Sequence, residues 1–308
     1  MKKSAPITGY GLQDKSSFCN QKGAALLITL LMVSILTGLV VDFAYEVYIG
    51  TSALSNWSNA QKASLAAKSG QALASNLLKA MKELPPTSQS EVILPIEKSF
   101  GENTILTVKL EDEEGKFNIN SLIFPNGKPD NDALDALQKL LEYLNINPDI
   151  RLYIADWIDP DNTPKASGSE DNAKNSALWS LEELRFIKGI DKETFDKISP
   201  YLTVYGSRKI NINTAKLPVL YSLVKSEPLA KEIIYYRESE PFKDLNKIKI
   251  PEIGSVVQNI QAKTSQVKFT AESTTFRVTA TATVDGITRV TESVMDNSTM
   301  KIHYWRES

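Results

Sequence analysis

The side chains with the most chemical potential lie in one acidic stretch, ADWIDPDNTPKASGSED, at residues 155–171. Their spacing is close to that of a calcium-binding EF-hand loop, in which positions 1, 3, 5, 7 and 12 supply oxygen atoms to the ion. In this chain those positions hold Asp159, Asp161, Thr163, Lys165 and Glu170. Further oxygens come from Asp156, Asp171 and Asn172. Position 6 should be glycine and is Pro164, so two interpretations stay open: a loop that binds a hard cation, and a solvated acidic loop.

No group of residues in the chain is typical of a catalytic site. The only histidine, His303, lies near the C-terminus without a nucleophile motif beside it. A metal-dependent hydrolase would need a histidine ligand or an open coordination position in the acidic stretch. We therefore predict that the protein is not an enzyme. With 35 basic and 37 acidic residues, the chain also lacks the positive charge that would favour nucleic acid as a main partner.

The acidic stretch lies in a helical region that separates two groups of predicted strands. The predicted strands lie at residues 91–100, 103–115, 274–296 and 300–308. Asp285-Gly286, inside the third of these segments, is typical of a two-residue hairpin turn. The region from about residue 121 to residue 263 is largely helical. The pattern predicts an α+β fold, in which an antiparallel sheet is interrupted by a large inserted α-helical domain.

Within the helical region a short motif occurs twice. NINSL at residues 118–122 and NINTA at residues 211–215 each precede an apolar-periodic helix, which is followed by a proline and a second helix. Asn, Ser and Thr at these starts can cap a helix N-terminus. The repeat favours a duplicated helical hairpin, with chance similarity of short helical patterns as the alternative.

The second hairpin also resembles the helix-hairpin-helix family, whose backbone amides can hold a DNA phosphate. That function needs a glycine-rich hairpin. The candidate hairpins VKSEP and IKGIDKETF instead contain acidic residues and at most one glycine, Gly189. We therefore expect no nucleic acid partner.

A run at the N-terminus predicts a membrane location. The 18 uncharged, mostly apolar residues 24–41 would span about 27 Å as a helix, just enough for a hydrocarbon core of about 30 Å. Lysines outnumber the single Asp14 before the run, and the first charges after it are Asp42 and Glu46. By the positive-inside rule the N-terminus is cytoplasmic and the rest is exported. The only cysteine, Cys19, then lies on the cytoplasmic side, so the exported part has no disulfide to form.

The sequence after the apolar run argues against a cleavable signal peptide. Apolar residues continue at helical spacing, and no proline interrupts them until Pro85 and Pro86. A signal peptide would have a shorter apolar region followed by a small-x-small cleavage site. We expect one helix of about 60 residues that crosses the membrane and continues as an amphipathic stalk.

Lys22-Gly23 followed by AALLITLL resembles the processing site of type IV pilin-like proteins. The resemblance implies that a prepilin peptidase cuts between Gly23 and Ala24, that the apolar run is kept, and that Ala24 is N-methylated. Most such proteins have glutamate at the fifth mature position, where it pairs with the terminal amine of a neighbouring subunit. Here that position is Ile28, which favours a subunit at the filament tip, with loss of the acid by drift as the alternative. The leader is longer than is usual, and Ala24 replaces the common aromatic residue.

Together the motifs resemble the type II secretion system protein K family. They are the Ile28 departure, GKFNINSL, DWIDPD...GSED, SLEELRFIKGI, PYLTVYGSRKININTA and the C-terminal strands. The resemblance implies a minor pseudopilin of the inner membrane, with a cytoplasmic N-terminus and a periplasmic C-terminal domain. Such a protein forms the tip of the pseudopilus with other minor pseudopilins and helps to initiate its assembly for the export of folded proteins.

The resemblance also implies contacts and a cofactor. The expected partners are the major pseudopilin, the inner-membrane secretion platform and the prepilin peptidase. A calcium ion is expected in the α-domain, where the matching acidic residues are Asp159, Asp161, Glu170 and Asp171. The alternative function is a competence- or type IV pilus-related minor pilin with a DNA-binding helical hairpin.

The resulting domain plan has five parts. Residues 1–23 are the leader, residues 24–86 the transmembrane and stalk helix, and residues 87–120 the first part of a pilin-like β-domain. Residues 121–263 form the inserted α-domain with the acidic loop, and residues 264–308 the C-terminal strands of the β-domain.

Overall fold

The computed structural model describes residues 17–81, 86–97 and 103–308. The chain divides into two units, residues 1–59 and residues 60–308, and helix α1 (Ser17–Met81) contributes to both. In the first unit every residue from 23 to 50 is exposed, and the helix is long and apolar enough to cross a membrane. The predicted continuous helix is thus confirmed as far as Met81. Pro85 and residues 1–16 of the predicted leader lie outside the described residues.

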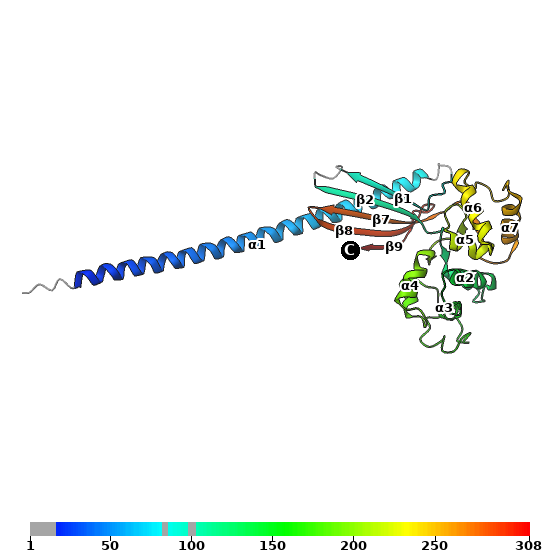
Figure 1. The fold of residues 1–308 in the computed structure, drawn as a ribbon, viewed down its shortest axis with the longest axis horizontal. Helices are drawn as coiled ribbons and strands as arrows, with labels where there is room; N and C mark the ends of the chain where they lie inside the picture. The colour runs from blue at the N-terminus through cyan, green and yellow to red at the C-terminus, as the bar shows by residue number, and fades with distance from the viewer. Residues whose placement is uncertain (1–16, 82–85, 98–102) are drawn as a thin grey trace, which may run out of the picture. The chain divides into compact units, whose positions relative to one another are not determined.

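The second unit contains a five-stranded antiparallel sheet (Figure 1). In spatial order the strands are β1 (Glu91–Glu97), β2 (Thr104–Asp112), β7 (Thr275–Val284), β8 (Ile287–Asp296) and β9 (Ile302–Glu307). Strands β2 and β7 are neighbours although residues 113–274 separate them in the chain, which confirms the predicted α+β fold with an inserted region. Asp285 and Gly286 join β7 to β8 with φ angles of 47° and 83°, the left-handed backbone that a two-residue hairpin turn needs.

The last turns of helix α1 pack on one face of this sheet (Figure 1). The buried helix residues are Ala66, Ala67, Ala74 and Leu78, and the sheet residues that they meet include Leu106, Val108, Ala280 and Met295. A Cβ atom on Gly70 would lie 2.8 Å from the Cβ of Ala280 and 3.1 Å from the Cδ1 of Leu106. Glycine at this position therefore permits the close approach of helix and sheet.

We expect the Gly70→Ala substitution to lower the free energy of unfolding by about 1–3 kcal/mol, because the added methyl group overlaps Ala280. This loss would occur although alanine favours a helix over glycine by about 1 kcal/mol. Gly50→Ala is the matched control, since a Cβ atom there meets nothing within 4 Å, and it should be neutral or stabilising. Urea unfolding of the full chain in detergent, followed by circular dichroism, measures both variants. Equal stability of the two would contradict the close approach.

The inserted region is built from two similar halves. The first consists of β3 (Phe117–Asn118), η1 (Ile119–Leu122), α2 (Asn131–Tyr143), α3 (Ile150–Ile158), η2 (Leu181–Phe186), α4 (Lys192–Ile198), η3 (Ser199–Tyr201) and β4 (Leu202–Thr203). The second consists of β5 (Ile210–Asn211), α5 (Leu217–Val224), α6 (Glu227–Ser239), α7 (Pro251–Ala262) and β6 (Phe269–Thr270). In each half the first strand pairs in parallel with the last. The predicted repeat is therefore present, and it extends from the helical hairpin to a third helix and a closing strand.

The repeated asparagines hold each half together. Asn120 accepts the N–H of Leu178 at 2.8 Å and donates to the carbonyl of the same residue at 3.0 Å. Asn213 makes the same two bonds to Phe242, both at 2.8 Å.

The expectation that these motif residues can cap a helix N-terminus is confirmed for η1, where the side chain of Asn118 accepts the N–H of Asn120 at 3.0 Å. Helix α2 is instead capped by Asp130, and the N-cap side chain of α5 makes no capping bond. Helix α2 begins well beyond the first motif, and the N-cap position of α5 is Lys216, the residue directly after the second motif.

One hydrophobic core fills the inserted region and runs from Phe117 to Phe269. It extends beyond the predicted boundaries at residues 121 and 263, because the short strands β3 and β6 belong to the two halves. Strands of two residues are too short to show an alternation of apolar and polar residues, so the sequence pattern could not detect them.

Candidate functional site

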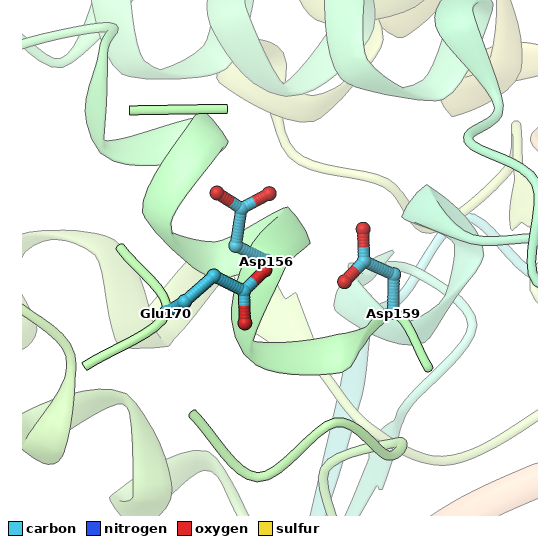
Figure 2. Close-up of side chains that lie close together, drawn as sticks. All are labelled: Asp156, Asp159 and Glu170. Atoms are coloured by element: carbon cyan, nitrogen blue, oxygen red, sulfur yellow. The ribbon is translucent and has the colours of Figure 1, made fainter. Parts of the chain in front are cut away.

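The acidic loop begins where helix α3 ends. Ile154 and Ile158 anchor this helix in the core, which places Asp156 on its last turn and Asp159 directly after it. Both aspartates are at most 1% exposed. Glu170 approaches them from the returning part of the loop (Figure 2). One carboxylate oxygen from each of the three residues lies within 4.8 Å of the other two.

Several of these oxygens lack a partner. Oδ1 of Asp159 and both carboxylate oxygens of Glu170 are shielded from solvent and have no hydrogen-bond donor among the described residues. Partial burial and the charges of Asp156 and Asp159 raise the pKa of Glu170. Unpartnered buried carboxylate oxygens are costly, and a hard cation with oxygen ligands would satisfy them. The donor set therefore fits calcium.

The oxygens of Asp156 are fully engaged. Its Oδ2 accepts the backbone N–H of Lys165 at 2.6 Å and the hydroxyl of Ser169, and its Oδ1 accepts the ammonium group of Lys165 at 2.8 Å. The same ammonium group also donates to Oδ2 of Asp159. Burial raises the pKa of Asp159, although the hydrogen bond and charge of Lys165 oppose the shift. Lys165 thus supplies one positive charge to a cluster of three carboxylates.

The structure brings together only part of the predicted metal set. Asp159 and Glu170 belong to the cluster, but Asp161 and Asp171 do not. Asp161 is exposed, and its Oδ1 accepts the N–H of Thr163 at 2.7 Å, so its side chain turns back on its own loop. Asp171 is also exposed. Positions 1 and 12 of the EF-hand register, Asp159 and Glu170, thus lie together, and position 3, Asp161, lies outside the cluster.

Asp156 is the ligand candidate that the predicted set left out. It precedes Asp159 by three residues, and residues three apart share one face of a helix. That spacing at the end of a predicted helix was the signal that could have included it.

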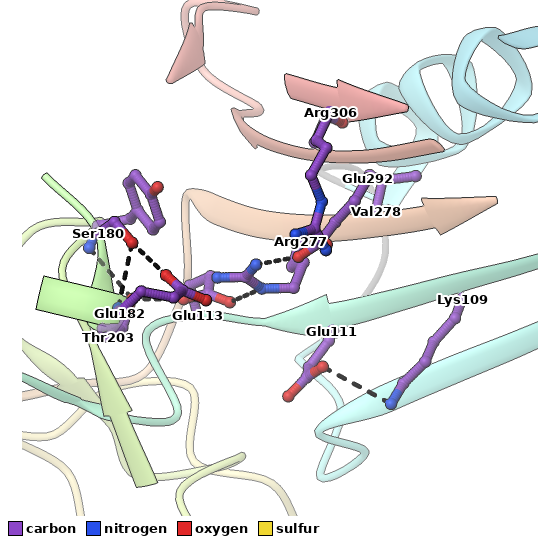
Figure 3. Close-up of polar contacts among 12 residues, drawn as sticks. Lys109, Glu111, Glu113, Ser180, Glu182, Thr203, Arg277, Val278, Glu292 and Arg306 are labelled. Atoms are coloured by element: carbon purple, nitrogen blue, oxygen red, sulfur yellow. Dashed lines mark hydrogen bonds and ion pairs between the residues drawn. The ribbon is translucent and has the colours of Figure 1, made fainter. Parts of the chain in front are cut away.

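A second polar cluster joins the sheet to the first half of the inserted region (Figure 3). Glu113, which is fully buried, accepts the Nε of Arg277 at 2.6 Å and the hydroxyl of Thr203 in β4. Arg277 in turn pairs with Glu292, which also pairs with Arg306 at 3.0 Å. The cluster therefore fixes strand β4 against strands β7 and β8.

The carboxylates on either side of Glu113 hold the rest of the inserted region. Glu114 accepts the backbone N–H of Ser207 at 3.0 Å, in the segment between the two halves. Asp112 accepts the hydroxyl of Thr214 at 2.6 Å and the amide of Asn211 at 3.2 Å, both in the second half. Burial raises the pKa of Asp112 to about 6, although these bonds favour its charged form. The sequence pattern predicts only the end of a strand for this acidic run, because the partners of its carboxylates lie far away in the chain.

Comparison with known proteins places these features in a family context. A family model described as type II secretion system protein K matches residues 115–207. Type II secretion system protein K of Pseudomonas aeruginosa is 25% identical over 268 residues, which cover 78% of this chain and 80% of that protein. Its counterpart in Aeromonas hydrophila is 25% identical over 229 residues, with 64% and 68% covered.

A solved structure shares the fold. It is the GspK-GspI-GspJ complex from the type 2 secretion system of enterotoxigenic Escherichia coli, in which one chain matches with a TM-score of 0.64 and 20% identity. The match covers 84% of this chain and 99% of that chain. It supports the assignment of an α+β pilin-like fold.

Proposed function

Because the chain belongs to the type II secretion system protein K family, we propose that it is a minor pseudopilin at the tip of the periplasmic pseudopilus. There it helps to start pseudopilus assembly for the export of folded proteins across the outer membrane. The observation that carries the proposal is helix α1, which is exposed and apolar over its first part and packs against the sheet with its last turns. That division suits a subunit that is held in a membrane and presents a folded domain outside it.

Ile28 supports the tip position. Its side chain is 54% exposed and lies on the apolar part of α1, where an unpaired carboxylate would be costly in lipid. A subunit with no neighbour above it has no terminal amine to pair with an acid at this position. An isoleucine there fits the first subunit of the filament.

The partners follow from the family. We propose contacts with other minor pseudopilins, by analogy with the solved GspK-GspI-GspJ complex. Contacts with the major pseudopilin and the inner-membrane secretion platform belong to the same proposal. The chain would lie in the inner membrane, with its N-terminus in the cytoplasm and residues after about 42 in the periplasm.

A prepilin peptidase is expected to cut between Gly23 and Ala24, after which Ala24 is methylated. Gly23→Val should block this cleavage and abolish secretion in cells that lack their own protein K. Gly38→Val is the matched control, because both glycines lie on the exposed part of α1 and a Cβ atom on either meets nothing within 4 Å. Mass spectrometry of the N-terminus and the amount of a secreted enzyme in the medium give the two readouts.

Three results would contradict the proposal. A mature chain that begins at Met1, or beyond the apolar run, would exclude processing as a pseudopilin. Full secretion with the uncleaved Gly23→Val protein would show that secretion does not depend on this cleavage. Gold label on the C-terminus should mark one end of sheared pseudopili, and label along their length would exclude the tip position.

We also propose that the acidic loop binds calcium through Asp156, Asp159 and Glu170. The support is the set of unpartnered oxygens on Asp159 and Glu170, which face one another across the loop. An ion bound there would tie the end of helix α3 to the returning segment of the loop and neutralise the carboxylates that it links. Asp161 and Asp171, the other residues of the predicted set, lie outside this cluster.

A further inference from the structure

The acidic cluster already contains a cation that belongs to the chain. The ammonium group of Lys165 lies between two buried carboxylates, 2.8 Å from Oδ1 of Asp156 and in direct contact with Oδ2 of Asp159. Its side chain is 24% exposed, so it reaches the cluster from the solvent side. Lysine carries its charge on a compact group at the end of a flexible stem, which allows it to occupy and to leave such a position.

Lys165 satisfies only part of the cluster. Within the part of the chain that the structure describes, Oδ1 of Asp159 has no donor, although this residue is 1% exposed, and both oxygens of Glu170 also lack one. Three carboxylates with one ammonium group leave two negative charges uncompensated. The two oxygens that Lys165 contacts are, however, oxygens that such an ion would need as ligands.

We propose that Lys165 is an internal competitor for the divalent cation and thereby sets the affinity of the loop for calcium. The proposal rests on the calcium site proposed above. An ion that enters the cluster must first displace the ammonium group from Asp156 and Asp159. Without the ion, Lys165 keeps the buried aspartates paired and preserves the folded loop.

The backbone of the loop permits this exchange without rearrangement. The N–H of Lys165 donates to Oδ2 of Asp156 at 2.6 Å, and Ser169 also bonds to that oxygen. These two bonds hold the middle and the returning part of the loop on the same carboxylate. The side chain of Lys165 can therefore swing out while its own backbone stays in place.

Calcium titration of the full chain in detergent, by isothermal calorimetry, tests the competition. Lys165→Met should bind calcium at least about tenfold more tightly than the wild type, because the competing charge is gone. In chelator the same variant should melt at a lower temperature than the wild type, because Asp156 and Asp159 then lack the ammonium group of Lys165. Lys165→Gln gives the same test should the methionine variant fail to fold.

Two further variants isolate the effect. Lys165→Arg keeps a positive charge and should bind calcium nearly as weakly as the wild type. Lys188→Met removes a charge from the same region, where Lys188 donates to the carbonyl of Ser167 at 3.1 Å, and should leave the affinity unchanged. Equal calcium affinity in wild type and Lys165→Met would overturn the competition and leave the calcium site standing. No binding by either protein would overturn the calcium site itself.

Discussion

In the Arg277→Met variant, the protein is expected to lose about 3–5 kcal/mol of its free energy of unfolding. The substitution removes the cation that contacts Glu113 at 2.6 Å and leaves a fully buried carboxylate with one fewer partner. Arg277 also pairs with Glu292, so the substitution removes an ion pair between strands β7 and β8 as well. Urea unfolding of the full chain in detergent measures the loss.

The control for this variant is Lys109→Met. Lys109 pairs with Glu91 at 2.7 Å, but both side chains are well exposed, so we expect a loss below about 1 kcal/mol. Replacing Glu113 by glutamine in the Arg277→Met background should restore part of the stability, since the buried charge is then gone. Equal losses in Arg277→Met and Lys109→Met would show that the buried cluster does not hold the inserted region.

The pH dependence of this loss has a defined sign. Burial acts to raise the pKa of Glu113, but the charges of Lys116 and Arg277 outweigh it and hold the pKa below the ordinary 4.5. The pairing therefore stabilises the protein above pH 4.5, and this contribution is lost as the pH falls through the lowered pKa. The difference between wild type and Arg277→Met should shrink accordingly in acid.

Calcium is expected to raise the melting temperature of the full chain by roughly 5–10 °C when its concentration is about 100 times the dissociation constant. Asp159→Asn should abolish this shift, because it removes one charge from the cluster and alters an unpartnered oxygen. Asp161→Asn should preserve it, because Asp161 is exposed and bonds to Thr163. Differential scanning calorimetry with calcium and with chelator measures both variants.

Asp156 and Asp161 separate two explanations of the loop, because Asp156 belongs only to the cluster in the structure and Asp161 only to the EF-hand spacing. Loss of the calcium shift in Asp161→Asn but not in Asp156→Asn would support EF-hand spacing over the cluster that the structure shows. An identical melting temperature of the wild type in calcium and in chelator would favour a solvated acidic loop without an ion.

Features that depend on neighbouring residues could be predicted from the sequence. The apolar run and its helical continuation fixed helix α1, and alternation together with Asp285-Gly286 fixed strands β7 and β8 and their turn. The two NIN motifs indicated the repeat. Each of these signals lies within a short window, because helix and strand periodicity are local properties of the backbone.

Contacts between distant segments could not be predicted in this way. Asn120 and Asn213 bond to the backbone of Leu178 and Phe242, and Glu113 pairs with Arg277 on a strand that returns after the whole insertion. Nothing in the local pattern tells a surface asparagine or glutamate from a buried one with a remote partner.

The acidic loop combines features that could be predicted from the sequence with features that could not. Its composition alone predicted a cation site that includes Asp159 and Glu170. The packing of helix α3 decided that Asp156 joins them, and a bond within the loop decided that Asp161 does not. The position of the Lys165 ammonium group was decided in the same way, because a long side chain takes its direction from the charges around it after folding. The sequence by itself thus determined which charged side chains the loop contains, and the tertiary structure decided which of their atoms lie together.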